Sequence, residues 1–317
     1  MKRILKIAVA VLIVAILGTG VFLGLYLSNG SILSPISFKW NFSNQIRIVA
    51  AENFWGSLVS QLGGTRVQVL SIVTDPNADP HEYESNSADA RAVSTANYVI
   101  MNGAGYDDWM TKLLSAGSIS NQKVLNVASL LHKSEGDNPH FWYSPYYVNS
   151  TVHQMYLDLI SIDQNGTSYY TQQYAALNQS LGAYNQKIDQ IKARFSGTKV
   201  ASTESIFVYL ANATGLNLVS PPAFMQAVSE GNDPSSQDVI TFTNQLENGT
   251  AKLLVYNNQT VTDVTTNMQG VAIRYHVPIV GITETIVPPT EPFQDWMNAE
   301  LTSIQAALQQ ITTVTGQ

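Results

Sequence analysis

Residues 168–195, SYYTQQYAALNQSLGAYNQKIDQIKARF, are the most regular segment of the sequence. Large apolar side chains recur there at alternating intervals of four and three residues, at Tyr170, Tyr174, Leu177, Leu181, Tyr184, Ile188, Ile191 and Phe195. This period predicts one helix with a single apolar stripe. At 1.5 Å per residue the helix would be about 40 Å long, which is enough to span two lobes as a backbone. A core helix inside one lobe is the alternative that the periodicity leaves open.

Short β-rich runs alternate with helical stretches on both sides of this segment. The predicted strands are Ile46–Ala51, Val67–Val73, Tyr98–Asn102 and Lys123–Val127 before it, and Lys199–Ser202, Leu216–Val219, Leu253–Asn257 and Pro278–Ile282 after it. The expected helices are Glu52–Leu62, Ala88–Ala96, Asp107–Ala116, Ser205–Thr214, Ser235–Leu246, Val261–Tyr275 and Glu291–Gln310. This order predicts an α/β protein with parallel sheets. We expect an N-terminal lobe at 46–165, a linking helix at 166–196 and a C-terminal lobe at 197–317.

The composition excludes several classes of protein. Charged residues make up 12% of the 317 residues, well below the typical value of about 25%. This low charge content and the aromatic content of 9% exclude a disordered chain. A net charge of -7 argues against a nucleic-acid binder and favours cations as ligands. Because the sequence has no cysteine, it has no disulfide, thiolate metal site or cysteine nucleophile.

The N-terminal region predicts a membrane anchor. Ile7–Leu27 is an uncharged run of 21 residues, and a bilayer core needs about 20 helical residues. Basic residues precede the run, so the N-terminus is expected in the cytoplasm. We therefore expect an anchor or signal segment at 1–28 and a tether at 29–45, with a single-pass protein whose globular part is extracytoplasmic. A long, cleaved signal peptide is the alternative. Eight Asn-x-Ser/Thr sequons fit an exported protein.

Two of the five histidines lie in similar loops. His81 follows Asp79-Pro80, and His140 follows Asn138-Pro139. Because proline fixes its own φ and restricts the residue before it, each histidine is presented on a stiff loop. Stiff presentation suits a metal ligand, since less loop entropy is lost on binding. Surface or structural roles are expected for the other three, which are His132, His153 and His276.

Two glutamates follow predicted strands of the second lobe. Glu204 comes after the strand at 199–202, and Glu284 comes after the strand at 278–282. Open α/β sheets bind ligands at the carboxyl ends of their strands. His81 and His140 also follow strands, so all four side chains are expected to line one cleft between the lobes. Taken singly, either carboxylate also fits a solvated or capping acid.

Several motifs, in order along the chain, resemble one known family. They are DPHEYE at 79–84, YVIMNG at 98–103, GYDDW at 105–109, NPHFW at 138–142, Glu204 with Phe207, Tyr209 and Leu210, and EGNDPS at 230–235. The chain thereby resembles the metal-specific solute-binding proteins of ABC transporters, the zinc, manganese and iron group also called periplasmic solute-binding protein family 9. The resemblance implies two α/β lobes joined by one long rigid helix. It also implies a cation in the cleft, which is delivered to a membrane permease driven by a cytoplasmic ATPase.

By this resemblance, His81 and His140 match the two first-lobe metal ligands. Glu204 stands where zinc-type members usually carry a third histidine and manganese-type members a glutamate. Glu284 stands where the family usually has aspartate. The His-rich acidic loop of zinc importers is absent, since Ser129–Asp137 is short and holds one histidine. Two imidazoles and two carboxylates indicate manganese or zinc as the transported ion, with iron also compatible.

Three functions are compatible with these residues. The first is the binding component of a metal importer, which is not an enzyme, acts as a monomer with a permease and binds no nucleic acid. The second is a metal-dependent hydrolase with Glu82 or Glu84 as general base, although no HExxH or GxSxG motif supports it. The third is a non-metal binding or cell-adhesion protein on the same scaffold. The first interpretation is favoured.

Overall fold

The first lobe is built on a four-stranded parallel sheet. The computed structural model describes residues 45–77 and 80–315, with side chains up to Ile311. The strands of the first sheet are β1 (Ile46–Glu52), β2 (Val67–Val73), β3 (Tyr98–Met101) and β4 (Lys123–Asn126). Their order across the sheet is β2-β1-β3-β4, and Ile48 of β1 pairs with Val69 on one side and Tyr98 on the other.

The second lobe repeats this topology. Its strands are β5 (Lys199–Ser202), β6 (Asn217–Leu218), β7 (Leu254–Asn257) and β8 (Ile279–Ile282), in the order β6-β5-β7-β8, and all are parallel. All eight strands were predicted from the sequence. In each sheet the second strand in the sequence lies on one side of the first strand, and the third lies on its other side. This change of direction opens a crevice at the carboxyl ends of the central strands.

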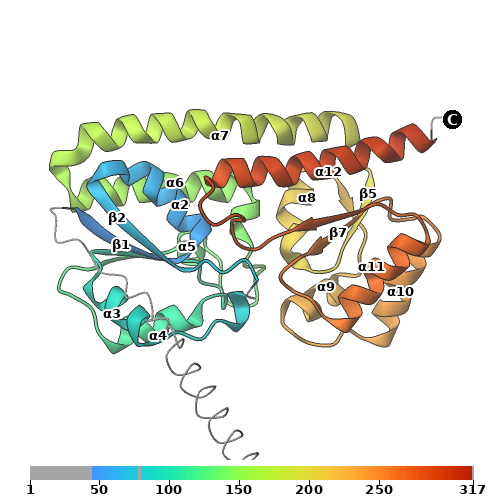
Figure 1. The fold of residues 1–317 in the computed structure, drawn as a ribbon, viewed down its shortest axis with the longest axis horizontal. Helices are drawn as coiled ribbons and strands as arrows, with labels where there is room; N and C mark the ends of the chain where they lie inside the picture. Colours follow the sequence, from blue (N-terminus) through green and yellow to red (C-terminus); the bar gives the residue numbers. More distant parts are fainter. Residues whose placement is uncertain (1–44, 78–79, 316–317) are drawn as a thin grey trace, which may run out of the picture. The chain divides into compact units, whose positions relative to one another are not determined.

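Helices cover both sheets (Figure 1). In the first lobe these are α2 (Asn53–Gly63), α3 (Ser87–Thr95), α4 (Asp108–Ala116), α5 (Val127–Leu130) and α6 (Pro145–Ile162). In the second lobe they are α8 (Val208–Thr214), α9 (Pro222–Ser229), α10 (Ser236–Glu247) and α11 (Asp263–Arg274). Short 3-10 turns are η1 (Gly64–Arg66), η2 (Pro80–Glu82), η3 (Phe141–Tyr143), η4 (Gln164–Gly166) and η5 (Ser205–Phe207). The sequence did not predict α9, because its two leading prolines favour a loop as well as a helix start.

The segment at 168–195 forms the long helix α7 (Thr167–Phe195), as predicted. Seven of its eight stripe residues are buried, and Tyr174 is partly buried. The helix packs against α2 and α6 of the first lobe and against α8 of the second. The interpretation as a core helix inside one lobe is therefore wrong. Its apolar stripe contacts both halves of the molecule.

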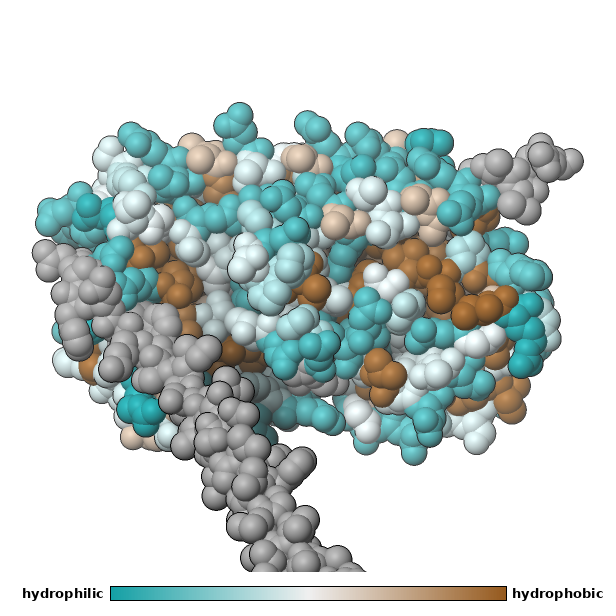
Figure 2. Space-filling view, viewed as in Figure 1, coloured by the Kyte–Doolittle hydropathy of each residue, from teal (hydrophilic) through white to brown (hydrophobic). Residues whose placement is uncertain are grey.

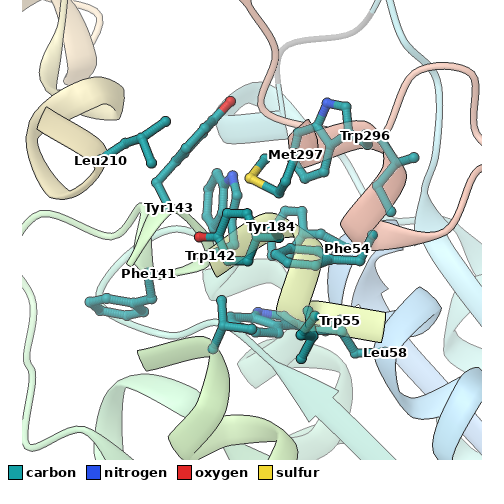
Figure 3. Close-up of a cluster of buried hydrophobic side chains, with 14 of the residues drawn as sticks. Phe54, Trp55, Leu58, Phe141, Trp142, Tyr143, Tyr184, Leu210, Trp296 and Met297 are labelled. Atoms are coloured by element: carbon teal, nitrogen blue, oxygen red, sulfur yellow. The ribbon is translucent and has the colours of Figure 1, made fainter. Parts of the chain in front are cut away.

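The C-terminal helix α12 (Phe293–Thr315) reinforces the connection between the lobes. It packs against α7, α2 and β8 and lies along α7 (Figure 1). Beneath it, large buried side chains from α2, η3, α7, α8 and α12 form one cluster (Figure 3). Phe54 and Trp142 stack there with their ring centroids 4.0 Å apart. The two lobes thus share one hydrophobic core.

The visible outer face is mainly hydrophilic to neutral, with a few hydrophobic patches (Figure 2). Since few residues are charged, amides and hydroxyls supply much of this polarity. Within the described residues, none of the helices has the length and apolar character needed to cross a membrane. The anchor predicted at 1–28 and nearly all of the tether predicted at 29–45 lie outside the described residues.

Candidate metal centre

The two Pro-His loops bring their imidazoles together. His81 lies in η2, and His140 lies immediately before η3. The ring centroids are 5.9 Å apart, and the planes are inclined at 72°. The His140 side chain is fully buried, whereas the His81 side chain is 23% exposed. The first lobe therefore presents one enclosed imidazole and one that borders solvent.

Hydrogen bonds determine which ring nitrogen of His140 carries a hydrogen. Its Nδ1 lies 2.8 Å from the Asn138 Oδ1 atom, which also accepts a 3.0 Å bond from the His140 backbone N–H. Because Oδ1 can only accept, Nδ1 carries the hydrogen and Nε2 keeps its lone pair. Nε2 is buried and has no hydrogen-bond partner among the described residues. Burial, and then the charge of nearby His81, holds the pKa of His140 well below its usual value. The imidazole is thus neutral, and its Nε2 lone pair is available to a metal ion.

The second lobe contributes two buried carboxyl groups. Glu204 lies two residues after β5, and Glu284 lies two residues after β8. Glu284 Oε2 is 3.4 Å from His81 Nε2 and 3.9 Å from His140 Nε2. Glu204 Oε2 is 3.9 Å from His140 Nε2. The carboxyl ends of strands in both lobes therefore meet at one point.

The spacing of these atoms suits a metal ion. Donor atoms of His81, His140 and Glu284 all lie within 4.8 Å of one another, whereas Glu204 does not come within that distance of all three. A tetrahedral ion with bonds of about 2.1 Å separates its donors by about 3.4 Å. The observed pairs at 3.4 and 3.9 Å are close to this value. To coordinate the same ion as the other three side chains, the Glu204 side chain would have to move further than they would.

Residues that the sequence analysis did not single out as ligands hold the carboxylates in place. The Tyr106 hydroxyl donates a 2.6 Å hydrogen bond to Glu284 Oε2 from across the interlobe boundary. The Asn257 amide bonds to both glutamates. Asn257 ends strand β7, so its position at the carboxyl end of a strand is the sequence signal that it shares with Glu204 and Glu284.

Tyr143 provides a further link between the lobes. Its hydroxyl lies 2.7 Å from the Thr283 carbonyl oxygen and 2.6 Å from Glu300 Oε2. A phenol has one hydrogen, so a bond to the carbonyl leaves the Glu300 contact to a proton on that carboxyl group. Burial raises the pKa of Glu300 to about 7, which agrees with a protonated acid near neutral pH. Since Thr283 directly precedes Glu284, this network ties the Glu284 loop to the His140 loop.

Two more buried acids lie at the carboxyl end of the first sheet. Glu52 ends β1, and its pKa is raised well above the usual value by burial and then by Asp107. Burial raises the pKa of Asp107 to about 6, although its carboxylate accepts hydrogen bonds from the backbone N–H groups of Asn102 and Gly103. The hydrogen bond between the two carboxyl groups raises the pKa of Glu52 and lowers that of Asp107, so Glu52 is the donor and Asp107 the acceptor.

The remaining candidates lie at the surface. Glu82 and Glu84, which were considered as bases of a hydrolase, are exposed. The other three histidines are also exposed, in agreement with the surface roles expected for them, and they are His132, His153 and His276.

The chain combines two parallel-sheet lobes, a long connecting helix and a buried cluster of imidazole and carboxyl groups. A family model described as ZnuA, zinc-uptake complex component A periplasmic, matches residues 48–307. The chain belongs to this family. The resemblance inferred from the motifs is thus confirmed.

Individual relatives agree with this assignment. The manganese-binding lipoprotein MntA of Halalkalibacterium halodurans is 28% identical over 181 residues, which are 55% of this chain and 59% of that protein. The zinc-binding protein TroA of Treponema pallidum is 22% identical over 54% of this chain and 56% of that protein. The chain thus covers little more than half of the length of these relatives.

Solved structures share the fold. The periplasmic zinc-binding protein TroA from Treponema pallidum matches with a TM-score of 0.71 at 16% identity, over 83% of this chain and 99% of that chain. A Mn-bound periplasmic metal-binding protein from Candidatus Liberibacter asiaticus matches with a TM-score of 0.69 at 17% identity, over 83% and 100%.

Proposed function

We propose that the protein captures a divalent transition-metal ion between its lobes and delivers it to a membrane permease of an ABC importer. The observation that carries this proposal is the convergence of His81, His140 and Glu284 within 4.8 Å, with Glu204 beside His140. We assign these four residues as ligands. Buried charges in proteins are normally paired or coordinate metals, and a divalent ion would compensate two ionised carboxylates.

The transported ion is manganese or zinc, and iron remains compatible with the donor set. Imidazole suits zinc and iron, while carboxylate suits manganese. Relatives carry both descriptions, since one is named a manganese-binding lipoprotein and another a zinc-binding protein. The ion is a cargo and not a catalytic cofactor, so we propose no enzymatic activity.

The proposed partners follow from the same function. The globular part would act as a monomer outside the cytoplasm, held at the cell membrane by the apolar run at 7–27, and would dock on the permease. A separation of membrane and soluble fractions from the native host tests the anchor. Recovery of the intact chain in the membrane fraction is expected, and recovery of a shortened soluble chain would instead indicate cleavage.

Elemental analysis of the full chain, purified without chelator, tests metal capture directly. One divalent ion per chain is expected, together with a rise in unfolding temperature when manganese or zinc is added to the metal-free protein. His153→Ala is a matched control, because this histidine is exposed on α6. A protein that binds neither ion and shows no thermal shift would support the non-metal binder. Ester or phosphoester hydrolysis that depends on His81 and His140 would support the hydrolase.

A further inference from the structure

Asn257 occupies a particular place in the proposed site. It ends strand β7, is 1% exposed and lies between the two glutamates. Its Nδ2 atom is 2.7 Å from Glu204 Oε1 and 2.6 Å from Glu284 Oε1. The Asn257 amide nitrogen thus donates to one oxygen, Oε1, of each carboxyl group.

The orientation of this amide is determined by its other end. Asn257 Oδ1 accepts a 2.9 Å hydrogen bond from the backbone N–H of Gln259. A flipped amide would turn its NH₂ toward this N–H and its oxygen toward two carboxylates, so both ends would be mismatched. The two N–H hydrogens therefore point to the glutamates. Thr260 Oγ1, at 3.0 Å from Nδ2, adds a further contact on the same side.

The two carboxylate oxygens of each glutamate have different neighbours. The Oε1 atoms of Glu204 and Glu284 face Asn257, while their Oε2 atoms face the imidazoles. The Glu284 loop is held in this position by Gln259, whose Oε1 accepts the backbone N–H groups of Glu284 and Thr285 at 2.8 and 3.0 Å. Each carboxylate is thus presented to an ion through one oxygen.

We propose that Asn257 is a specificity-determining residue, which keeps both glutamates monodentate and so favours a four-coordinate ion over a six-coordinate one. This inference rests on the proposed function. Two imidazole nitrogens and two single carboxylate oxygens make four donors, the number that zinc takes in closed protein sites. If both carboxylates turned to bind through two oxygens, the donors would number six, as octahedral oxygen-rich manganese sites require. The amide hydrogen bonds oppose that rotation.

Cobalt(II) added to the metal-free full chain tests the inference without any substitution. Four-coordinate cobalt(II) absorbs visible light far more strongly than six-coordinate cobalt(II), because a tetrahedral ion has no centre of inversion. An intense visible spectrum is expected for the unaltered protein. A weak spectrum typical of six-coordinate cobalt would overturn the inference while leaving metal capture intact.

Asn257→Ala gives the second test, with Asn258→Ala as its control. Asn258 is the next residue in the chain and is exposed. Outer-shell substitutions change metal affinity by about 10–100-fold, so we expect the ratio of zinc to manganese affinity to fall at least about tenfold in Asn257→Ala and to stay unchanged in Asn258→Ala. The cobalt spectrum of Asn257→Ala should weaken in parallel. If Asn257→Ala loses zinc and manganese affinity equally and its cobalt spectrum is unchanged, Asn257 has only a structural role. If the protein without any substitution binds no metal, the proposed function itself is refuted.

Discussion

The two Pro-His loops are alike in sequence and different in structure. Each has an Asx residue before the proline and an aromatic residue soon after the histidine. His140 is enclosed, and its ring is oriented by Asn138. His81 borders solvent and packs its ring against Tyr106 at a centroid distance of 4.6 Å. Two similar loops thus hold one enclosed, oriented imidazole and one accessible imidazole.

The difference arises from contacts with the second lobe. Asn138 donates a 2.7 Å hydrogen bond to the Ser205 carbonyl oxygen, and the Tyr209 hydroxyl donates a 2.8 Å bond to the Asn138 carbonyl oxygen. In the first loop, Tyr83 bonds to Asp89 within its own lobe. The His140 loop is therefore part of the interlobe boundary.

The largest effect is expected for His140→Ala. Loss of an enclosed ligand should lower zinc or manganese affinity by more than the factor of about 100 that outer-shell changes reach. It should also lower the unfolding temperature of the metal-free protein by several degrees, because the emptied volume is fully buried. Calorimetric titration and thermal unfolding measure the two effects. Unchanged affinity would refute the ligand assignment.

His81→Ala separates binding from stability. The affinity loss should again exceed about 100-fold, since one of four ligands is removed. The unfolding temperature of the metal-free protein should change by less than in His140→Ala, because the His81 side chain is partly exposed. If both variants destabilise the metal-free protein equally, the contrast between a fixed and an accessible ligand is wrong.

Asn138→Ala tests what holds the fixed ligand. The substitution leaves His140 in place but removes the acceptor of its Nδ1–H. An affinity loss of about 10–100-fold is expected, as for other groups that accept a hydrogen bond from a metal-binding histidine. Asn149→Ala, an exposed asparagine on α6, is the control and should bind metal normally. A loss in both variants would contradict a specific role for Asn138.

Lowering the pH should destabilise the metal-free protein, because His140 is buried. The pKa of His140 is lowered in the folded state, so the unfolded chain binds a proton that the folded chain does not. Folding stability is then lost as pH falls below about 6.5, the pKa of unfolded histidine. Thermal unfolding between pH 7.5 and 5 should therefore show a smaller decline in His140→Ala than in the unaltered protein. An identical decline in both would contradict a neutral, buried imidazole.

A further effect concerns the contact of Glu300 with Tyr143, which holds the His140 loop. The pKa of Glu300 is raised to about 7, so its contribution to stability is present at acid pH and is lost as pH rises from about 4.5 through 7. Glu300→Gln removes this titration. At pH 8 the variant should therefore gain stability relative to the unaltered protein, by up to about 3 kcal/mol compared with the same difference at pH 5.

Chemical denaturation at the two pH values measures this gain. Glu135→Gln, which changes an exposed glutamate, is the control. A pH-independent difference between Glu300→Gln and the unaltered protein would show that Glu300 is ionised throughout, and the Tyr143 hydrogen would then be shared between its two acceptors.

Local patterns in the sequence were sufficient for the architecture. The 4,3 spacing at 170–195 predicted α7, and the alternation of β-rich and helical runs predicted both parallel sheets. Such patterns are readable because helix and strand periods are properties of neighbouring residues. The Pro-His loops and the strand-end glutamates also named the four candidate ligands.

Only the tertiary structure decided how those groups meet. The hydrogen bond between Tyr106 and Glu284 joins residues 178 positions apart, and no local period encodes such a pair. Likewise, the burial of His140, the partial exposure of His81 and the bridging position of Asn257 depend on how two lobes pack across α7 and α12. Donor atoms must agree to within a fraction of an ångström, and that precision comes from long-range packing of the shared core.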